Sequence, residues 1–257
     1  MLQGSWLAID DVEPLLESVA GANVGINFVL AWPQEERFEH ALEAGAKIVA
    51  IAWGDAAPFV TRAHAAGALL IGTVASAEEA RKAEDAGVDI VVTQGWEAGG
   101  HIWGDVATMA LVPAVVDAVS IPVIASGGIG DGRGIAAALA LGADGVWLGT
   151  RFVASLESPH LYKERIVAAD ETDARRTMVF AKDWDAPHRV LRNRALDQGV
   201  SRPYAAPESD KELDTAALYA GQSAGLIHSV KSVAQIVADL VAETEQALSS
   251  AAARPSA

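Results

Sequence analysis

The sequence contains no cysteine, which excludes disulfides, thiolate nucleophiles, iron–sulfur clusters and cysteine-based zinc sites. It is also poor in basic residues, with 19 Lys and Arg against 34 Asp and Glu and a formal net charge of −15. Nucleic acids and anionic membrane surfaces are bound by clustered basic side chains, so neither is an expected partner. An anionic ligand would have to be held by local groups rather than by the overall field.

Long apolar runs are missing as well. No stretch reaches the roughly 18–20 uninterrupted apolar residues of a membrane span. Asp10, Asp11 and Glu13 near the N-terminus do not fit the basic start of a signal peptide. The six histidines form no pattern of metal-ligand spacing with acidic residues. We therefore expect a cytoplasmic protein with no metal site.

What the sequence does contain is a repeated unit of polar helix, Ala-Gly and apolar strand. The glycines at the joints are Gly45, Gly67 and Gly87, each placed where a helix ends in the left-handed conformation. Ser76 with Glu79 three residues later predicts a capped helix start. The strands are continuously apolar, as in a parallel sheet covered on both faces.

This alternation predicts an α/β fold of the TIM (β/α)8-barrel type. Six strands are clear: Gly25–Leu30, Lys47–Trp53, Leu69–Val74, Asp89–Thr93, Pro122–Ser126 and Gly145–Gly149. A barrel of this type has eight strands, and residues 1–7 could be the tail of one more. We therefore expect a barrel that lacks its N-terminal βα unit.

The pattern changes after Phe152. We assign residues 1–152 to the barrel units, 153–248 to a helical and irregular C-terminal region packed on the barrel, and 249–257 to a disordered tail. Helices are expected at 155–173, near 213–220 and at 230–248, whereas Arg175 to Gly199 is basic and irregular.

Three glycine-rich segments follow successive strands: Gln94 to Gly104, Ala125 to Ile129 and Leu148 to Phe152. Glycine lets the backbone approach a flat ligand closely, and the loops after the last strands of such barrels commonly bind phosphate. The helix that opens near Gly132 would add its N-terminal dipole. Tight turns alone would also explain these glycines.

His101 lies in the first of these loops, on the face where barrel active sites assemble. A pKa near neutrality suits it as a general base, although a histidine bound to a backbone carbonyl would also fit. Glu97 is better explained by a role in positioning the loop. Arg151 could neutralise a phosphate or form a salt bridge, and Arg133 at a helix start suggests an ion pair or a ligand contact.

Three motifs resemble the nitronate monooxygenase family of FMN-dependent TIM-barrel enzymes. They are Gln-Gly-Trp-Glu-Ala-Gly-Gly-His at 94–101, Pro-Val-Ile-Ala-Ser-Gly-Gly-Ile-Gly-Asp-Gly-Arg-Gly at 122–134, and Gly-Ala-Asp-Gly-Val-Trp-Leu-Gly-Thr-Arg-Phe at 142–152. Gly-Ile-Asn-Phe at 25–28 is similar to a further strand of the family. The resemblance extends from about Gly21 to Asn193 and is weaker at 221–225.

The resemblance implies a role for each matching residue. His101 would be the catalytic base beside the substrate. FMN would be bound by residues that contact the ring or ribityl chain, pack beside the flavin or bind its phosphate: Asn27, Thr73, Gln94, Ala98, Gly99, Gly100, Ser126, Gly127, Gly128, Gly149 and Thr150. The substrate would be a nitronate or nitroalkane, converted with O2 to a carbonyl compound and nitrite.

Two departures from the family pattern bear on FMN binding. The family's first strand, whose end lies against the flavin, has no counterpart here, and Thr73 stands where relatives often carry a longer Lys or Gln. Two alternatives therefore remain beside a nitronate monooxygenase. One is a flavin-dependent enoyl-acyl-carrier-protein reductase that oxidises NAD(P)H, and the other is a truncated, non-catalytic barrel that survives as a homodimer.

Overall fold

The computed structural model describes residues 1–181, 186–200 and 207–253. These residues form two compact units. Unit 1 comprises Met1–Thr93 and Ala114–Ile124, and unit 2 comprises Gln94–Pro113 and the rest of the chain from Ala125. This division differs from the ranges 1–152 and 153–248 expected from the sequence, which stay a proposal.

The main element is a sheet of seven strands in the order β1-β2-β3-β4-β5-β7-β8. Its strands are β1 (Leu2–Gln3), β2 (Ile26–Val29), β3 (Ile48–Ala52), β4 (Leu69–Val74), β5 (Ile90–Gln94), β7 (Val123–Ser126) and β8 (Gly145–Trp147). The pairs from β1 to β5 are parallel. All six predicted strands are confirmed, and residues 1–7 contribute a seventh. In the described part of the chain, the edge strands β1 and β8 are not paired with each other, so the sheet is not closed into a barrel.

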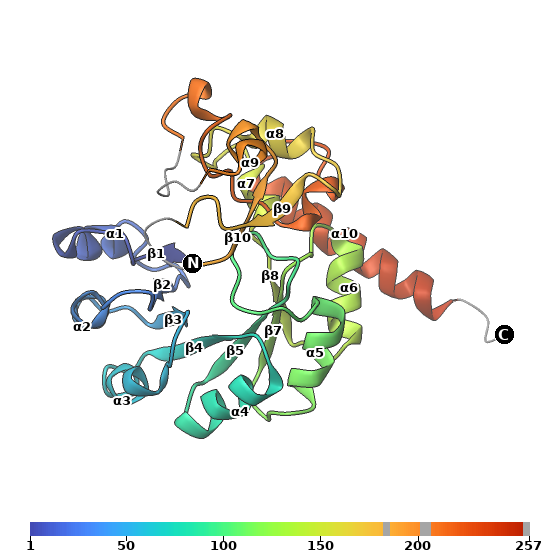
Figure 1. Ribbon diagram of the computed structural model, residues 1–257. Coiled ribbons are helices and arrows are strands. Elements are labelled where there is room, and N and C mark those ends of the chain that lie inside the picture. Colours follow the sequence, from blue (N-terminus) through green and yellow to red (C-terminus); the bar gives the residue numbers. More distant parts are fainter. Residues whose placement is uncertain (182–185, 201–206, 254–257) are drawn as a thin grey trace. The chain divides into compact units, whose positions relative to one another are not determined.

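In unit 1, helices alternate with the strands and lie on one side of them (Figure 1). They are η1 (Ile9–Asp11), α1 (Val12–Glu17), α2 (Glu35–Glu43), α3 (Ala57–Ala65) and α4 (Ala77–Ala86). Three phenylalanines form the centre of the packing. Phe28, Phe38 and Phe59 are buried and meet edge to face, with ring centroids 6.1 and 4.8 Å apart.

The local signals at the helix ends behave as the sequence predicts. Gly45, Gly67 and Gly87 have φ angles of +87°, +68° and +92°. The Ser76 hydroxyl accepts a hydrogen bond from the Glu79 N–H at 3.1 Å and caps α4. These signals depend only on neighbouring residues, which is why the sequence is sufficient to find them.

Unit 2 contains a small antiparallel sheet, β6-β10-β9, that the sequence pattern did not predict. Its strands are β6 (Gly100–His101), β9 (Ala174–Thr177) and β10 (His188–Leu191). The helices of this part of the chain are α6 (Gly132–Ala140), α7 (Thr150–Val153), α8 (Lys163–Val167), α9 (Arg194–Gln198), η2 (Asp210–Glu212), η3 (Gln222–Leu226) and α10 (Val233–Ala252); α5 (Thr108–Val116) is divided between the units.

Several C-terminal expectations were wrong in detail. The helix expected at 155–173 is confined to α8, because Pro159 interrupts the segment before it. The region expected to be irregular forms β9, β10 and α9. Residues 213–220 are not helical, because Tyr219 bridges to Val190 and the Leu191 N–H donates to the Leu218 carbonyl at 2.8 Å.

The predicted disordered tail is helical over its first four residues, because α10 continues through Ala252. Alanine has the highest helix propensity, and this helix ends with two alanines, followed by Ala253 as its C-cap. Residues 254–257 of the predicted tail lie outside the described residues. Among the helices that the structure describes, none combines the length and apolar character needed to cross a membrane.

Candidate active site

The loop after β5 is held by the side chain of its first residue. Gln94 donates from Nε2 to the His101 carbonyl at 2.9 Å and accepts from the Trp103 N–H at Oε1 at 2.8 Å. One amide group therefore bonds both sides of the His101 position. Gln94 is placed to shape the loop, and its contact with a flavin stays a prediction.

Glu97 joins the same loop to the start of α5. One carboxylate oxygen, Oε2, accepts from both the N–H and the hydroxyl of Thr108, each at 2.9 Å. The Thr108 hydroxyl also lies 2.9 Å from the carbonyl of Gly127. The loop after β5 and the loop after β7 are therefore connected through one threonine, and Glu97 positions the loop as the sequence predicts.

A third segment, far along the chain, packs directly on this loop. A Cβ atom added at Gly99 would lie 2.4 Å from the Gly221 nitrogen, so only glycine allows this approach. The Gln222 N–H donates to the Glu97 carbonyl at 3.0 Å, and the Gly221 N–H donates to the Thr150 hydroxyl at 2.9 Å. Residues from three regions of the chain thus meet at one place in unit 2.

His101 lies on β6, which pairs with β10 so that His101 is opposite His188. The Tyr219 hydroxyl is 3.2 Å from His101 Nε2, and the His101 ring centroid lies 5.7 Å from that of His188. Burial, and secondarily the positive charge that His188 can carry, lowers the pKa of His101 to about 3. The ring is therefore neutral at pH 7.

His188 is fully buried and is a structural residue. Its Nε2 accepts from the Phe180 N–H at 3.3 Å, and its Nδ1 lies 3.0 Å from the Ala186 carbonyl. These two partners require a neutral ring with the proton on Nδ1. Burial also lowers the pKa of His188. His188 therefore contributes to the packing of unit 2 as a neutral ring.

The buried Arg189 holds the loop from the side of β10. Its guanidinium donates to the carbonyls of Trp96, Ala98 and Ala174 at 2.7, 3.1 and 3.3 Å. It also lies over the Trp96 ring, 5.6 Å from the centroid. Burial lowers the pKa of Arg189, and the charge of Glu97 opposes this shift. A single side chain therefore bonds the backbone on both sides of Glu97.

The predicted phosphate segments lie at the ends of β7 and β8. Ser126 ends β7, and Gly127 and Gly128 follow with φ angles of +102° and +73°. Gly149 caps α7, and a Cβ atom added there would meet nothing within 4 Å. The space beside the Gly149 backbone is therefore open, which fits a bound group.

The N-terminus of α6 already has its own anion. The Gly132 N–H donates to the carboxylate of Glu243 on α10 at 2.9 Å, and the Gly134 N–H donates to Asp131 at 3.0 Å. This helix start therefore offers a phosphate less than the sequence suggests. Arg133 forms an ion pair with Asp131.

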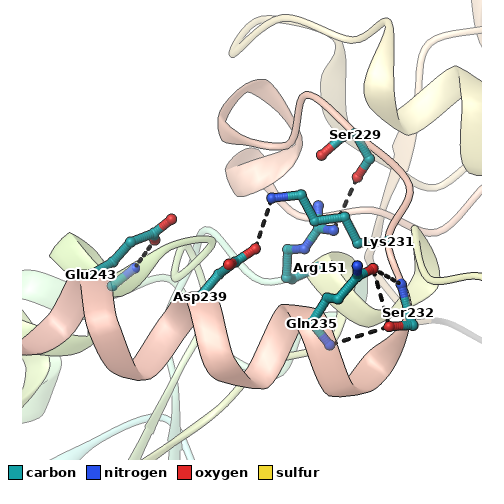
Figure 2. Close-up of polar contacts among 8 residues, drawn as sticks. Arg151, Ser229, Lys231, Ser232, Gln235, Asp239 and Glu243 are labelled. Atoms are coloured by element: carbon teal, nitrogen blue, oxygen red, sulfur yellow. Dashed lines mark hydrogen bonds and ion pairs between the residues drawn. The ribbon is translucent and has the colours of Figure 1, made fainter.

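Arg151, the second residue of α7, is a structural residue. It is buried and donates to the Ser229 carbonyl at 3.0 Å, close to the start of α10 (Figure 2). Burial lowers the pKa of Arg151. Ser232 and Gln235 form a capping box at that helix start, and Lys231 pairs with Asp239 at 2.7 Å. The side chain stabilises the segment that precedes α10.

Asn27 and Thr73, the two remaining predicted flavin ligands, belong to unit 1. The register pairs Asn27 with Ala50 and Ala50 with Ile71, so Asn27 and Thr73 lie on the same face of the sheet. Asn27 is buried and donates from Nδ2 to the Gln3 side chain at 3.2 Å. Thr73 is half-buried near the end of β4.

Unit 2 collects the other predicted residues. These are Gln94, Ala98, Gly99, Gly100, His101, Ser126, Gly127, Gly128, Gly149 and Thr150. Sequence reasoning missed Thr108, Arg189 and Tyr219, which complete this arrangement. No local pattern singles them out, although Arg189 lies in a segment whose basic character is visible in the sequence.

Comparison with known proteins identifies the arrangement. The family model for nitronate monooxygenase matches residues 6–243. A (3aS,4S,5R,7aS)-5-hydroxy-7a-methyl-1-oxo-octahydro-1H-indene-4-carboxyl-CoA dehydrogenase of Rhodococcus jostii is 38% identical over 186 residues, which cover 72% of this chain and 51% of that protein. The chain spans about half the length of the curated relatives that it matches.

Two solved structures share the fold over most of both chains. FabK from Thermotoga maritima has a TM-score of 0.85 and 34% identity, and the match covers 96% of this chain and 85% of FabK. Nitroalkane oxidase from Streptomyces ansochromogenes has a TM-score of 0.84 and 27% identity, with 97% and 89% covered. The predicted TIM-barrel type of fold is confirmed by these neighbours.

Proposed function

The chain belongs to the nitronate monooxygenase family, and from this premise we propose that it is an FMN-dependent enzyme that oxidatively denitrifies alkyl nitronates or nitroalkanes with O2. Family membership makes the chain a flavin-type oxidoreductase. The observation that carries the proposal is the neutral His101 beside Tyr219, in a loop whose glycines leave the backbone accessible.

The residues of unit 2 fit a flavin. A Cβ atom added at Gly100 or Gly149 would meet nothing within 4 Å. The space beside the backbone at these two positions therefore leaves room for a ligand. Ser126, Gly127, Gly128, Gly149 and Thr150 would hold the phosphate, and Ala98, Gly99 and Gly100 would lie beside the ring, with Gln94 at the loop start. Flavin contacts of Asn27 and Thr73, which belong to unit 1, rest on the family resemblance alone. When bound, FMN supplies the electron acceptor for the substrate and the reductant for O2.

His101 favours an anionic substrate. A neutral imidazole can accept a proton, but a pKa of about 3 makes abstraction of a proton from a neutral nitroalkane costly. A nitronate has already lost that proton, and its negative charge would stabilise a protonated ring. The Tyr219 hydroxyl at 3.2 Å orients the imidazole for either role. We therefore place nitronates ahead of nitroalkanes as substrates.

A second candidate is a flavin-dependent reductase that uses NAD(P)H, similar to enoyl-acyl-carrier-protein reductases. A specific observation favours it, because a relative at 38% identity is named a dehydrogenase of a carboxyl-CoA compound. The two candidates share the flavin and differ in the electron donor. Association as a homodimer is compatible with both, and light scattering measures it directly.

The first experiment is the visible absorption spectrum of the freshly purified chain before any cofactor is added. We expect flavin bands, and the released cofactor should co-chromatograph with FMN. Anaerobic addition of a nitronate should then bleach the bands rapidly. Rapid bleaching by NADH or NADPH, without bleaching by the nitronate, would favour the second candidate. A protein that stays colourless with added FMN would overturn both.

A further inference from the structure

Unit 2 contains a cavity that the proposed flavin site does not use. Its volume is about 540 Å³, within the range of about 300–1,000 Å³ found for small-molecule sites. Arg175 and Arg176 on β9 line it together with Arg192, which follows β10. Leu196 on α9 adds an apolar wall. None of the residues predicted to bind FMN lines this cavity.

The charge of the cavity opposes the charge of the whole chain. Three arginines line it against one acidic residue, Asp197, whereas the chain has a formal net charge of −15. Five arginines fall between Arg175 and Arg194, in a chain with 19 lysines and arginines in all. This short segment is therefore basic, although the chain as a whole is acidic. A local cluster of positive charge of this kind is typical of a site that binds an anion.

Much of the hydrogen-bonding capacity of these arginines is unused. Within the described part of the chain, the Arg175 side chain forms no hydrogen bond or ion pair, and its charge helps to lower the pKa of Asp170. Arg176 pairs with Asp105 at 3.4 Å. Arg192 pairs with Asp197 through Nε at 2.8 Å, which leaves both of its terminal nitrogens available. The guanidinium group presents a rigid set of donors that matches phosphate oxygens. The cavity can therefore bind phosphate groups at more than one point.

The cavity is connected to the candidate active site through the small sheet. Thr177, a lining residue on β9, pairs with His188 on β10, which pairs with His101 on β6. Two inter-strand spacings of about 4.8 Å place Thr177 roughly 10 Å from His101. Arg176 also lies over Trp96 of the active-site loop, 4.4 Å from the ring centroid. A ligand anchored in the cavity thus needs an extended tail to reach His101.

We propose that this cavity binds the phosphate groups of a phosphorylated adenosine nucleotide whose reactive end extends to the flavin site. Two ligands carry this chemistry on a tail of sufficient length: NADPH, with a 2′-phosphate, and a coenzyme A thioester, with a 3′-phosphate. Binding of the nucleotide to this cavity does not itself require the flavin. The nucleotide proposal can therefore fail while the proposed function holds, and the proposed function can fail while the cavity still binds the nucleotide.

The test is isothermal titration calorimetry on the full chain with adenosine 2′,5′-bisphosphate, adenosine 3′,5′-bisphosphate and unphosphorylated adenosine. We expect at least one bisphosphate to bind, and adenosine to bind at least tenfold more weakly. The preferred bisphosphate distinguishes the two sources, the 2′,5′ compound indicating NADPH and the 3′,5′ compound coenzyme A.

Arg175→Gln and Arg192→Gln should each weaken bisphosphate binding tenfold or more. The matched control is Arg165→Gln, which removes an exposed arginine paired with Asp214 outside the cavity and should change affinity less than twofold. All three variants should keep the visible spectrum of the parent protein. Absence of binding by the parent, or equal loss in Arg165→Gln and Arg175→Gln, would overturn the proposal.

Discussion

At the scale of single residues, the environment of His101 decides what the site can do. The same ring that the sequence suggests as a base has a pKa lowered to about 3 by burial. A base is most effective when its pKa lies near the working pH. His101 therefore suits a substrate that arrives ionised, and its charge does not change between pH 5 and 8 in the ligand-free protein.

His101→Ala should retain flavin but lose turnover of neutral nitroalkanes by about 10²–10⁴-fold, the usual effect of losing a general base. Turnover of preformed nitronates should fall less, because their carbon is already deprotonated. The measurement is kcat/KM for a matched nitroalkane and nitronate pair. His64→Ala, at an exposed histidine paired with Asp89, is the control. An equal loss for both substrates would show that His101 orients the substrate rather than removing a proton.

At the scale of elements, the candidate site is a junction of glycine-rich segments held by backbone contacts. Thr108 connects the loops after β5 and β7, and Arg189 on β10 bonds the first of these loops through two carbonyls, those of Trp96 and Ala98. Gly99 and Gly221 bring together two segments that are more than a hundred residues apart. The geometry of the site therefore depends on glycine at defined positions.

Two substitutions test two different roles of these glycines. Gly99→Ala tests close packing of the backbone, and Gly149→Ala tests the open space proposed for the phosphate. At Gly99 a methyl group would lie 2.4 Å from the Gly221 nitrogen, so the backbone must shift, at a cost of about 1–3 kcal/mol. We expect a lower Tm and weak flavin binding. At Gly149 the φ of −108° accommodates alanine and the space is open, so the Tm should stay the same.

Flavin binding by Gly149→Ala should nevertheless weaken at least tenfold, because the methyl group would occupy the space assigned to the phosphate. The measurements are thermal unfolding and flavin titration of both variants. Unchanged flavin affinity in Gly149→Ala would place the phosphate elsewhere, and an unchanged Tm in Gly99→Ala would contradict the close contact.

At the scale of the whole molecule, the net charge of −15 acts on every anion that approaches. Fields from distant charges extend about 30 Å at 0.01 M salt and about 8 Å at 0.15 M. The phosphate of FMN is itself anionic, so the overall field should slow its association. Local backbone and arginine groups act only at short range.

The association rate constant of FMN with protein freed of its flavin should therefore rise as salt increases from 0.01 to 0.15 M. Stopped-flow quenching of flavin fluorescence measures it, and riboflavin, which lacks the phosphate, is the control with little salt dependence. A rate constant that falls with salt would show that local basic groups dominate the encounter.

The sequence alone was sufficient for six strands of the seven-stranded sheet, the helix ends at Gly45, Gly67 and Gly87, and the type of fold. These features follow from the spacing of apolar residues and from the conformational preferences of single residues. Both depend only on residues that are close together in the sequence. The three glycine-rich motifs likewise point to the family from the sequence alone. Local signals determine which elements form.

The tertiary structure decided how the site is assembled. Thr108, Arg189 and Tyr219 act through partners that are distant in sequence, and no local pattern marks them. Pairing of β9 with β10 turned an apparently irregular segment into a sheet, because strand pairing depends on a partner rather than on propensity. The low pKa of His101 and the arginine-lined cavity arise from burial and proximity, which exist only once the chain has folded.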